Sequence, residues 1–178
     1  MSRLLTVGHG TLTAERFSEL VRGAGVDLVV DVRRYPGSRR YPHFGSGPMA
    51  AWLPPRGVAY RWLPALGGRR SPSPRSPNTG LRNPQFRGYG DHMSSEEFSA
   101  GVAELLRVQG GRVAAVMCSE AVWWRCHRRL LADHLVLIEK VFVEHLFHDG
   151  RLVAHPLTPE ACPAAGRVVY GAVSNDSS

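Results

Sequence analysis

The segment Asp27–Val32, with the sequence DLVVDV, decides the fold of this chain. It is a short run of mostly β-branched side chains without polar alternation, and such a run is typical of a strand covered on both faces. The segment Arg112–Cys118, RVAAVMC, has the same character. Because helical segments separate these runs from further strands, the pattern indicates βαβ units and a mainly parallel sheet.

Helical segments flank the predicted strands. Apolar side chains recur at helical spacing within Thr13–Gly25, and Ser94 with Glu97 has the sequence of a capping box ahead of another apolar stripe. A further helix is predicted at Glu120–His134, directly after the strand that ends at Cys118. The remaining predicted elements are strands at Arg3–Val7, Val58–Leu63 and Lys140–Phe147 and a short helix at Pro48–Leu53.

The sequence thus predicts an α/β fold: a single domain with a mainly parallel sheet, helices on both faces and a C-terminal β-hairpin. The pair Asp149-Gly150 predicts a two-residue hairpin turn into RLVAHPL, residues 151–157. We assign residues 1–157 to this domain and residues 158–178 to a tail. Residues 69–84 are rich in Pro, Ser and Arg, so we expect a mobile loop there.

Composition limits the class of protein. With 178 residues and 43% apolar content, the chain is long enough for one sizeable core. No apolar run reaches the roughly 20 residues that span a bilayer, and the N-terminus lacks a secretory signal, so we expect a cytoplasmic protein with no membrane partner. Cys118, Cys126 and Cys162 are odd in number and are interpreted as free thiols.

The net charge of +7 favours anionic partners such as nucleic acid or phosphorylated metabolites. An alternative explanation is genomic, because every basic residue except Lys140 is Arg, as a GC-rich genome would produce. Charge alone therefore does not decide between these two explanations.

Polar side chains follow each predicted strand. In open α/β sheets, ligands bind beyond the carboxyl ends of the strands, so we expect one cleft there. We predict that its catalytic candidates are His9, Asp31, Cys118 and Glu120. At a predicted junction of strand and helix, Cys118 is either a nucleophile with a lowered pKa or a small buried side chain. We expect Glu120 to be the general acid or base and Cys118 its packed neighbour.

The arginine-rich segment DVRRYPGSRRYPHF, residues 31–44, is the candidate anion site. Guanidinium groups bind phosphate in bidentate fashion, and the interleaved aromatic rings can stack on bases. The alternative is a solvated basic loop. The predicted substrate contacts are Arg33, Arg34, Arg39, Arg40, Arg87, Tyr89, Trp124, His127 and Arg128.

The predicted helix at residues 120–134 brings Glu120, Trp124, His127 and Arg128 near one face. We expect Cys126 to lie in the core and His127 to be partly exposed. The spacing of the cysteines and histidines matches no zinc motif, so we predict neither a metal nor another cofactor.

Several motifs together resemble those of the DUF488 family, a group of small bacterial and archaeal proteins without an assigned function. The motifs are TVGHGT, DVRRYPGSRR, YRWLPALGGRR, FRGYGDHM and MCSEAVWWRCHRRLLADHL, in this order between Leu4 and His155. The resemblance implies a compact α/β domain and a functional role for these motifs, but it supplies no reaction.

Three functions fit these features. The first is an enzyme that acts on nucleic acid or a phosphorylated nucleotide through the acidic, histidine and cysteine cleft. The second is a non-catalytic nucleic-acid-binding module in which the arginines and aromatic rings do the work. The third is a thiol redox or sulfur-transfer protein. The sequence does not predict an oligomeric state.

Overall fold

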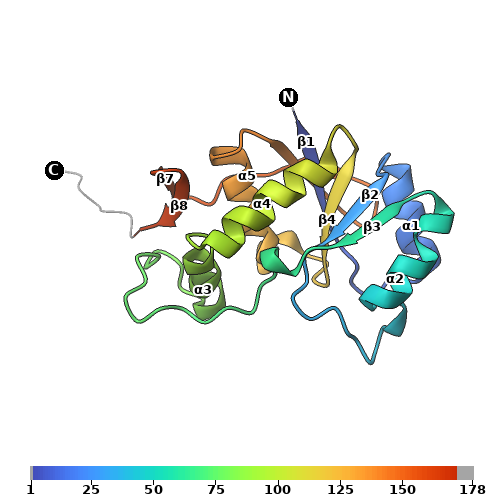
Figure 1. Cartoon of the computed structure of the whole chain (residues 1–178), viewed down its shortest axis with the longest axis horizontal. Helices are drawn as coiled ribbons and strands as arrows, with labels where there is room; N and C mark the ends of the chain where they lie inside the picture. The colour runs from blue at the N-terminus through green and yellow to red at the C-terminus, as the bar shows by residue number, and fades with distance from the viewer. Residues whose placement is uncertain (1, 172–178) are drawn as a thin grey trace.

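The computed structural model describes residues 2–171 and shows a mixed α/β domain. Its six-stranded sheet has the order β3-β2-β4-β1-β5-β6, and every neighbouring pair is parallel except β5 with β6. A separate antiparallel hairpin, β7-β8, follows (Figure 1). The strands are β1 (Arg3–Gly8), β2 (Leu28–Asp31), β3 (Ala59–Trp62), β4 (Ala114–Cys118), β5 (Phe142–Leu146), β6 (Leu152–Ala154), β7 (Ala161–Ala164) and β8 (Arg167–Tyr170).

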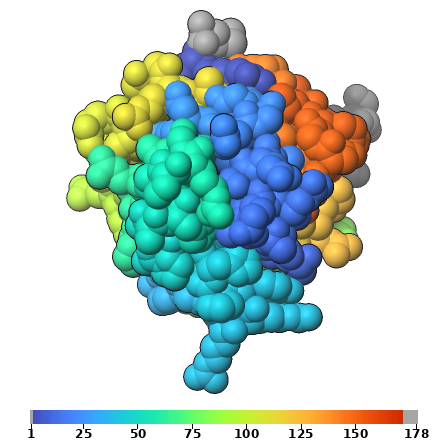
Figure 2. All heavy atoms as spheres, turned by 90° about the vertical axis from the view of Figure 1, so that its right-hand side faces the viewer, coloured from blue at the N-terminus to red at the C-terminus, as the bar shows by residue number. Residues whose placement is uncertain are grey.

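Helices cover both faces of the sheet, as predicted. On one face, α1 and α2 pack against β1, β2 and β4, whereas α3, α4, α5 and β8 cover the other face. Figure 1 shows α1 and α2 together at the right of the sheet, and Figure 2 shows the same side with α1 in blue beside the α2–β3 segment in cyan and green. The helices are α1 (Ala14–Gly23), α2 (Ser46–Trp52), α3 (Pro84–His92), α4 (Glu96–Gln109) and α5 (Arg128–Leu137).

Short 3₁₀ helices lie in the connections between these elements. Three of them begin with proline, which lacks the N–H that a first helical turn leaves unpaired. Their bounds are Pro42–Phe44, Pro54–Arg56, Pro64–Leu66 and Trp123–Arg125.

The sheet alternates its side chains between two cores. Leu4 of β1 and Val30 of β2 face α4, where they pack with Phe98. Their neighbours Leu5 and Val29 face α1 and α2. Both strands are buried along nearly their whole length, which explains why the sequence shows continuous apolar runs rather than alternation.

The predicted helix at Glu120–His134 is wrong over its first half. Residues 119–122 form a turn, Trp123–Arg125 form a 3₁₀ helix, and α5 begins only at Arg128. Cys126 has extended backbone angles that interrupt any helix at this point. The Trp123 ring stacks on His145 at 4.2 Å, so tertiary packing overrides the local helical pattern.

Two turns differ from prediction. The N-cap of α4 is Ser95, whose hydroxyl accepts from the Phe98 N–H, whereas the Ser94 N–H bonds the Asp91 carbonyl and so belongs to the end of α3. The β5-β6 hairpin has a three-residue loop, because the Phe147 N–H pairs with the Arg151 carbonyl. Gly150 takes a positive φ of 89° there, which suits glycine.

The loop at residues 69–83 has no regular secondary structure, yet its middle is held by side chains. The Asp91 carboxylate accepts from Ser76 and from Asn78, at 2.5 and 2.7 Å. Asn78 in turn accepts from the Tyr170 N–H, and the Gly80 N–H bonds the Tyr170 carbonyl at 2.8 Å. This loop therefore joins the C-terminal hairpin β7-β8, which lies in the segment that we had assigned to a tail. The mobility of the rest of the loop stays a prediction.

Candidate functional site

A pocket of about 360 Å³ opens at the carboxyl ends of the parallel strands, a volume within the range of small-molecule sites. Loops after four strands contribute to it, which is the arrangement expected of an open parallel sheet. The lining includes His9 after β1, residues 33–35 after β2, Gly68 and Arg69 after β3, residues 118–120 after β4, and residues 125–127 before α5.

Cationic side chains outnumber anionic ones in the pocket lining. Arg33, Arg34, Arg69 and Arg125 all contribute, and Glu120 is the one carboxylate among the lining residues. Positive charge concentrated in a concave site attracts anions. The pocket is therefore suited to a small anionic ligand or to the anionic part of a larger one.

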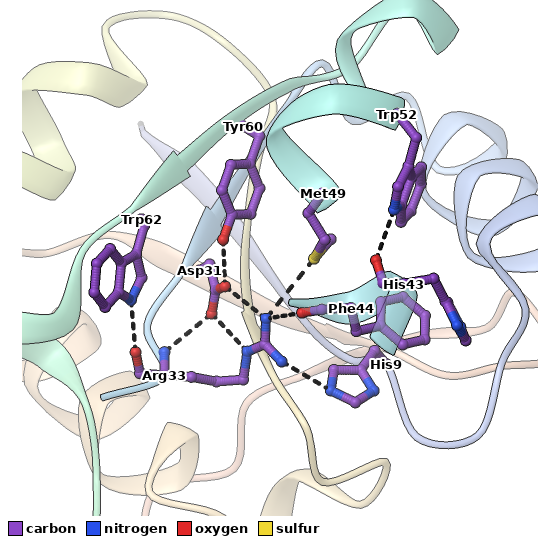
Figure 3. A network of polar contacts seen from close by, with 9 residues as sticks. All are labelled: His9, Asp31, Arg33, His43, Phe44, Met49, Trp52, Tyr60 and Trp62. Atoms are coloured by element: carbon purple, nitrogen blue, oxygen red, sulfur yellow. Dashed lines mark hydrogen bonds and ion pairs between the residues drawn. The ribbon is translucent and has the colours of Figure 1, made fainter. Parts of the chain in front are cut away.

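One wall of the pocket is a buried ion pair (Figure 3). Asp31 ends β2, and Arg33 returns to bond both oxygens of its carboxylate, with Nε–Oδ1 at 2.8 Å and Nη2–Oδ2 at 2.7 Å. The Tyr60 hydroxyl donates to Asp31 at 2.5 Å from the neighbouring strand. Asp31 is fully buried behind Arg33 and does not line the pocket, so Asp31 positions Arg33 rather than meeting a ligand.

His9 lies against this ion pair. Its Nδ1 donates to the Gly10 carbonyl at 2.9 Å, which leaves Nε2 to accept from Arg33 Nη1 at 3.2 Å. The ring stacks on Phe44 at 4.2 Å. Burial, together with the charge of Arg33, lowers the pKa of His9 to about 4 despite its bond to Gly10. His9 is therefore a neutral side chain at the pocket wall at neutral pH.

Two thiols meet at the base of the pocket. Cys118 ends β4 and Cys126 precedes α5, and their Sγ atoms lie 2.7 Å apart. Both residues are buried, yet both contribute to the pocket lining. Burial and the hydrogen bond to Cys126 raise the pKa of Cys118, so Cys118 is the protonated partner. The candidate for a cysteine nucleophile is therefore Cys126 rather than Cys118.

Cys126 has the surroundings of a thiolate. It accepts from the Cys118 thiol, and both the Arg128 backbone N–H and His127 Nδ1 lie 3.5 Å from its sulfur. Burial works to raise its pKa, but these donors and the charges of His127 and Arg128 outweigh burial and hold the pKa of Cys126 well below its usual value. A sulfur at the first turn of a helix also benefits from the helix dipole.

Glu120 lies in the turn after β4 rather than in a helix. Its side chain is exposed and lines the pocket, whereas its backbone carbonyl accepts from Arg128 Nη2 at 2.5 Å. The predicted common helical face of Glu120, Trp124, His127 and Arg128 is wrong, because α5 starts at Arg128. His127 lines the pocket and is partly buried, as predicted, whereas Arg128 is buried beneath it.

Of the other predicted substrate contacts, some line the pocket or an adjoining hollow and others do not. Arg34 lies at the pocket, and Arg40 lines an adjoining hollow that shares Ser119 and Glu120 with it. Arg39, Arg87 and Trp124 line neither of them.

Tyr89 is also separated from the pocket lining. It is fully buried and donates its hydroxyl to the Leu66 carbonyl, so it cannot contact a ligand at the surface. Its aromatic character made it resemble a stacking residue, but the glycines beside it in α3 allow close packing against the loop instead.

Sequence reasoning missed Arg69, Arg125 and the importance of Cys126. The signal that the sequence carries here is glycine at two positions where the chain packs closely. A Cβ on Gly8 would lie 1.8 Å from the Glu120 carbonyl oxygen, so only glycine lets the turn after β4 cross the end of β1. Gly68 similarly makes room for the His127 ring, with Nδ1 2.8 Å from the place of its Cβ.

Among residues 2–171, no cluster of three or more His, Cys, Asp or Glu side chains could hold a metal ion. Within the same residues, every helix is too short or too polar to cross a membrane. The site brings together a neutral histidine, the buried Asp31–Arg33 ion pair, a thiol pair and three further arginines.

Comparisons with known proteins agree with the motifs. A search of curated proteins and a search of solved structures return no significant match. A family model described as "Domain of unknown function DUF488" matches residues 13–135, which include β2, β3, β4 and the pocket residues from Arg33 to His127. Since the match covers more than half of the chain, the protein belongs to the DUF488 family.

Proposed function

We propose that the protein is an enzyme that uses Cys126 and Cys118 for thiol chemistry on an anionic substrate. The observation that carries this proposal is the 2.7 Å separation of the two Sγ atoms at the base of an arginine-lined pocket. A thiol donating to a thiolate is the arrangement that precedes disulfide formation, in which one sulfur attacks and the other resolves. The substrate carries an electrophilic sulfur atom, either in a disulfide or as sulfane sulfur.

The reaction has two steps. The Cys126 thiolate attacks the sulfur of a substrate R–S–X, forms Cys126–S–S–R and releases X⁻, which the arginines stabilise as it leaves. Cys118 then loses its proton and attacks the Cys126 sulfur, which releases R–S⁻ and leaves a Cys118–Cys126 disulfide. An external dithiol reductant restores both thiols and becomes oxidised itself.

Trapping tests this function. In a chain carrying Cys162→Ser, the exposed third thiol is absent, and exposure to glutathione disulfide or to thiosulfate should oxidise the Cys118–Cys126 pair. In the additional Cys118→Ser variant, the resolving thiol is lost, so an adduct should stay on Cys126 and be detected by mass spectrometry. Glutathione disulfide reports disulfide exchange, and thiosulfate reports sulfur transfer. Absence of an adduct on Cys126 with both reagents would contradict the proposal.

A second candidate is an enzyme or binding module for nucleic acid or a phosphorylated nucleotide. The observation that favours it lies at the pocket mouth, where the exposed Tyr35 ring has the guanidinium of Arg34 at 5.3 Å and that of Arg69 at 6.0 Å. An exposed ring beside cations can stack a base and hold its phosphate. In this function Glu120 is the candidate general acid or base.

Salt dependence separates the two candidates. If the arginines bind phosphates, affinity for a single-stranded oligonucleotide falls steeply with salt, and Arg69→Ala reduces the slope by about one. Arg39→Ala, outside the pocket lining, is the matched control. A nucleic-acid enzyme also loses activity with Glu120→Gln and retains it with Cys126→Ser, whereas the thiol enzyme shows the reverse.

A further inference from the structure

Arg128 is a buried cation whose charge is not balanced by a carboxylate. Its side chain is 1% exposed, and its guanidinium bonds neutral oxygens: Nη1 donates to the Thr6 hydroxyl at 3.2 Å and Nη2 to the Glu120 carbonyl. Within residues 2–171, Arg128 forms no ion pair with Asp or Glu, and its Nε has no partner. Because a buried charge is costly unless compensated, the arrangement calls for an anion close by.

The thiol pair supplies that anion. The Arg128 backbone N–H points at the Cys126 sulfur, and the turn that the Arg128 side chain bonds is the one that follows Cys118. Burial works to lower the pKa of Arg128, but the negative charge on the thiol pair outweighs burial and raises the pKa. Arg128 and the thiolate therefore stabilise each other.

Thr6 connects Arg128 to a line of buried polar side chains. Thr6 on β1 and His145 on β5 are neighbours in the parallel register, and the Thr6 hydroxyl lies 2.6 Å from His145 Nδ1. His145 Nε2 lies 2.9 Å from His155 Nδ1, and His155 Nε2 lies 2.8 Å from Asp133 Oδ1. Every side chain in this line is buried.

With both histidine rings neutral, one arrangement of protons satisfies every atom of this line. Asp133 can only accept, so His155 donates from Nε2 and accepts at Nδ1 from His145. His145 then accepts at Nδ1 from the Thr6 hydroxyl, and Thr6 accepts from Arg128, which can only donate. Burial, together with the charge of Arg128, lowers the pKa of His145 to about 3, so its ring is neutral as this arrangement requires.

The far end of the line is firmly held. The other oxygen of Asp133 accepts from the Tyr170 hydroxyl at 2.8 Å, and Oδ1 also accepts from the Thr158 N–H at 3.0 Å. Trp123 covers the middle by stacking on His145 with ring planes 2° apart. The line thus has a fixed anionic end at Asp133 and a cationic end at Arg128.

We propose that Arg128 is a positioning residue for the Cys126 thiolate, and that the chain of hydrogen bonds through Thr6, His145 and His155 to Asp133 fixes its guanidinium in place. This inference rests on the proposed function, because it assigns a purpose to Arg128 only if Cys126 reacts as a thiolate. The other titratable groups near Cys126 are Cys118, His127, Tyr89 and His145, and of these only His145 belongs to the chain of hydrogen bonds.

The test measures the reactivity of Cys126 in the full chain carrying Cys162→Ser. Alkylation by iodoacetamide is followed by peptide mass spectrometry from about pH 4 to about pH 9, and the pH midpoint reports the pKa of the thiol pair. Thr6→Val removes the hydroxyl at nearly constant volume. We expect it to raise the midpoint by about one pH unit and to lower the rate at about pH 6 roughly tenfold.

Three further variants separate positioning from simple destabilisation. Thr6→Ser keeps the hydroxyl and should restore the midpoint of the unmutated chain. His145→Leu should raise the midpoint as Thr6→Val does. His134→Leu replaces a buried histidine of α5 outside the chain of hydrogen bonds, so it should lower the melting temperature without moving the midpoint. If the Thr6→Val variant does not fold, His155→Gln alters the chain of hydrogen bonds at its Asp133 end and should also raise the midpoint.

The outcomes are distinguishable. An unchanged midpoint in both Thr6→Val and His145→Leu, with Cys126 still reactive below neutral pH, overturns the positioning role and leaves the proposed function intact. A Cys126 that reacts in the unmutated chain no faster than an ordinary thiol at neutral pH overturns the proposed function itself, and the positioning role with it.

Discussion

Two buried arginines lie next to the pocket, and they are compensated in different ways. Arg33 on the β2 side is paired with the Asp31 carboxylate through two hydrogen bonds. Arg128 on the α5 side bonds only neutral oxygens and lies beside the thiol pair. The first arginine carries its counter-charge permanently. The second depends on an anion that a proton, an oxidant or a substrate can remove.

This difference gives the two sides of one pocket different roles, one structural and one reactive. A closed ion pair such as Asp31–Arg33 gives a rigid wall, because neither partner can change its charge without leaving the other uncompensated. The α5 side keeps a charge that is balanced only while Cys126 is a thiolate. Reactivity is therefore expected on the α5 side, and stability on the β2 side.

The largest expected effect comes from breaking the closed pair. Asp31→Asn leaves the Arg33 charge buried without its carboxylate, so the free energy of unfolding should fall by about 3–5 kcal/mol. Cys126→Ser removes the anion beside Arg128, but Arg128 keeps its hydrogen bonds to Thr6 and to the Glu120 carbonyl, so the loss should be only about 1–2 kcal/mol. Denaturant unfolding of both variants checks the comparison. Equal losses would mean that the two arginines are compensated alike.

Acid should weaken both sides through one histidine each. The pKa of His9 is lowered to about 4 and that of His145 to about 3, below the model-peptide value of 6.5. Above pH 6.5 both are neutral in the folded and unfolded chains, whereas below it the unfolded chain binds protons that the folded chain does not. Stability is thus lost as pH falls, by about 2 kcal/mol for each histidine at pH 5.

Unfolding measured at about pH 7 and about pH 5 tests this acid sensitivity. His9→Leu and His145→Leu should each remove about 2 kcal/mol from the difference between the two conditions. His148→Leu, a histidine outside both clusters, is the comparison variant. If both variants show the same difference in the free energy of unfolding between the two conditions as the unmutated chain, neither ring is held neutral.

A smaller effect is expected at the pocket mouth. Arg69 and Arg125 line the pocket and lie outside both buried clusters, so Arg69→Ala and Arg125→Ala should each weaken sulfate binding by about 1–2 kcal/mol without loss of stability. Arg39 lies outside the pocket lining, so Arg39→Ala should leave sulfate binding unchanged. Calorimetric titration with sulfate measures this, and an equal loss in all three variants would indicate attraction by overall charge alone.

The smallest expected effect is that of Glu120→Gln on stability. The α5 side uses the backbone carbonyl of Glu120, which the substitution preserves, and its carboxylate is exposed. The free energy of unfolding should change by less than about 0.5 kcal/mol. A loss comparable to that of Asp31→Asn would show that the Glu120 carboxylate compensates Arg128 and would remove the distinction between the two sides.

The fold could be predicted because the central strands are buried on both faces and read as continuous apolar runs. The conformation of the segment between β4 and α5 could not be predicted, because it depends on the stacking of Trp123 on His145, which is distant in sequence. The periodicity of a sequence reflects contacts between residues that are close along the chain, so it carries no information about partners that are distant in sequence. The same limit applied to α3, whose Pro84 start and Asn83 cap were hidden beside a Pro-rich loop.

The place of the site was predictable, but the roles of its residues were not. Parallel strands deliver their following residues to one edge, so His9, Arg33, Cys118 and Glu120 meet there as expected. Which arginine is already neutralised, and which cysteine carries the charge, depends on contacts such as Arg33 with Asp31 and Cys118 with Cys126. No spacing in the sequence encodes these contacts, because they form only when separate loops converge.

The junction of Asn78 with Tyr170 also has a consequence for the order of events during synthesis. The strands β1 to β4 and their helices are complete long before residue 170 is made, so the sheet can form while the chain is still growing. The loop around Asn78 must wait, since its partners at Tyr170 are separated from it by 92 positions. We expect the newly made chain to pass through a state in which the sheet is formed and this loop is still open to proteases, until β8 closes it.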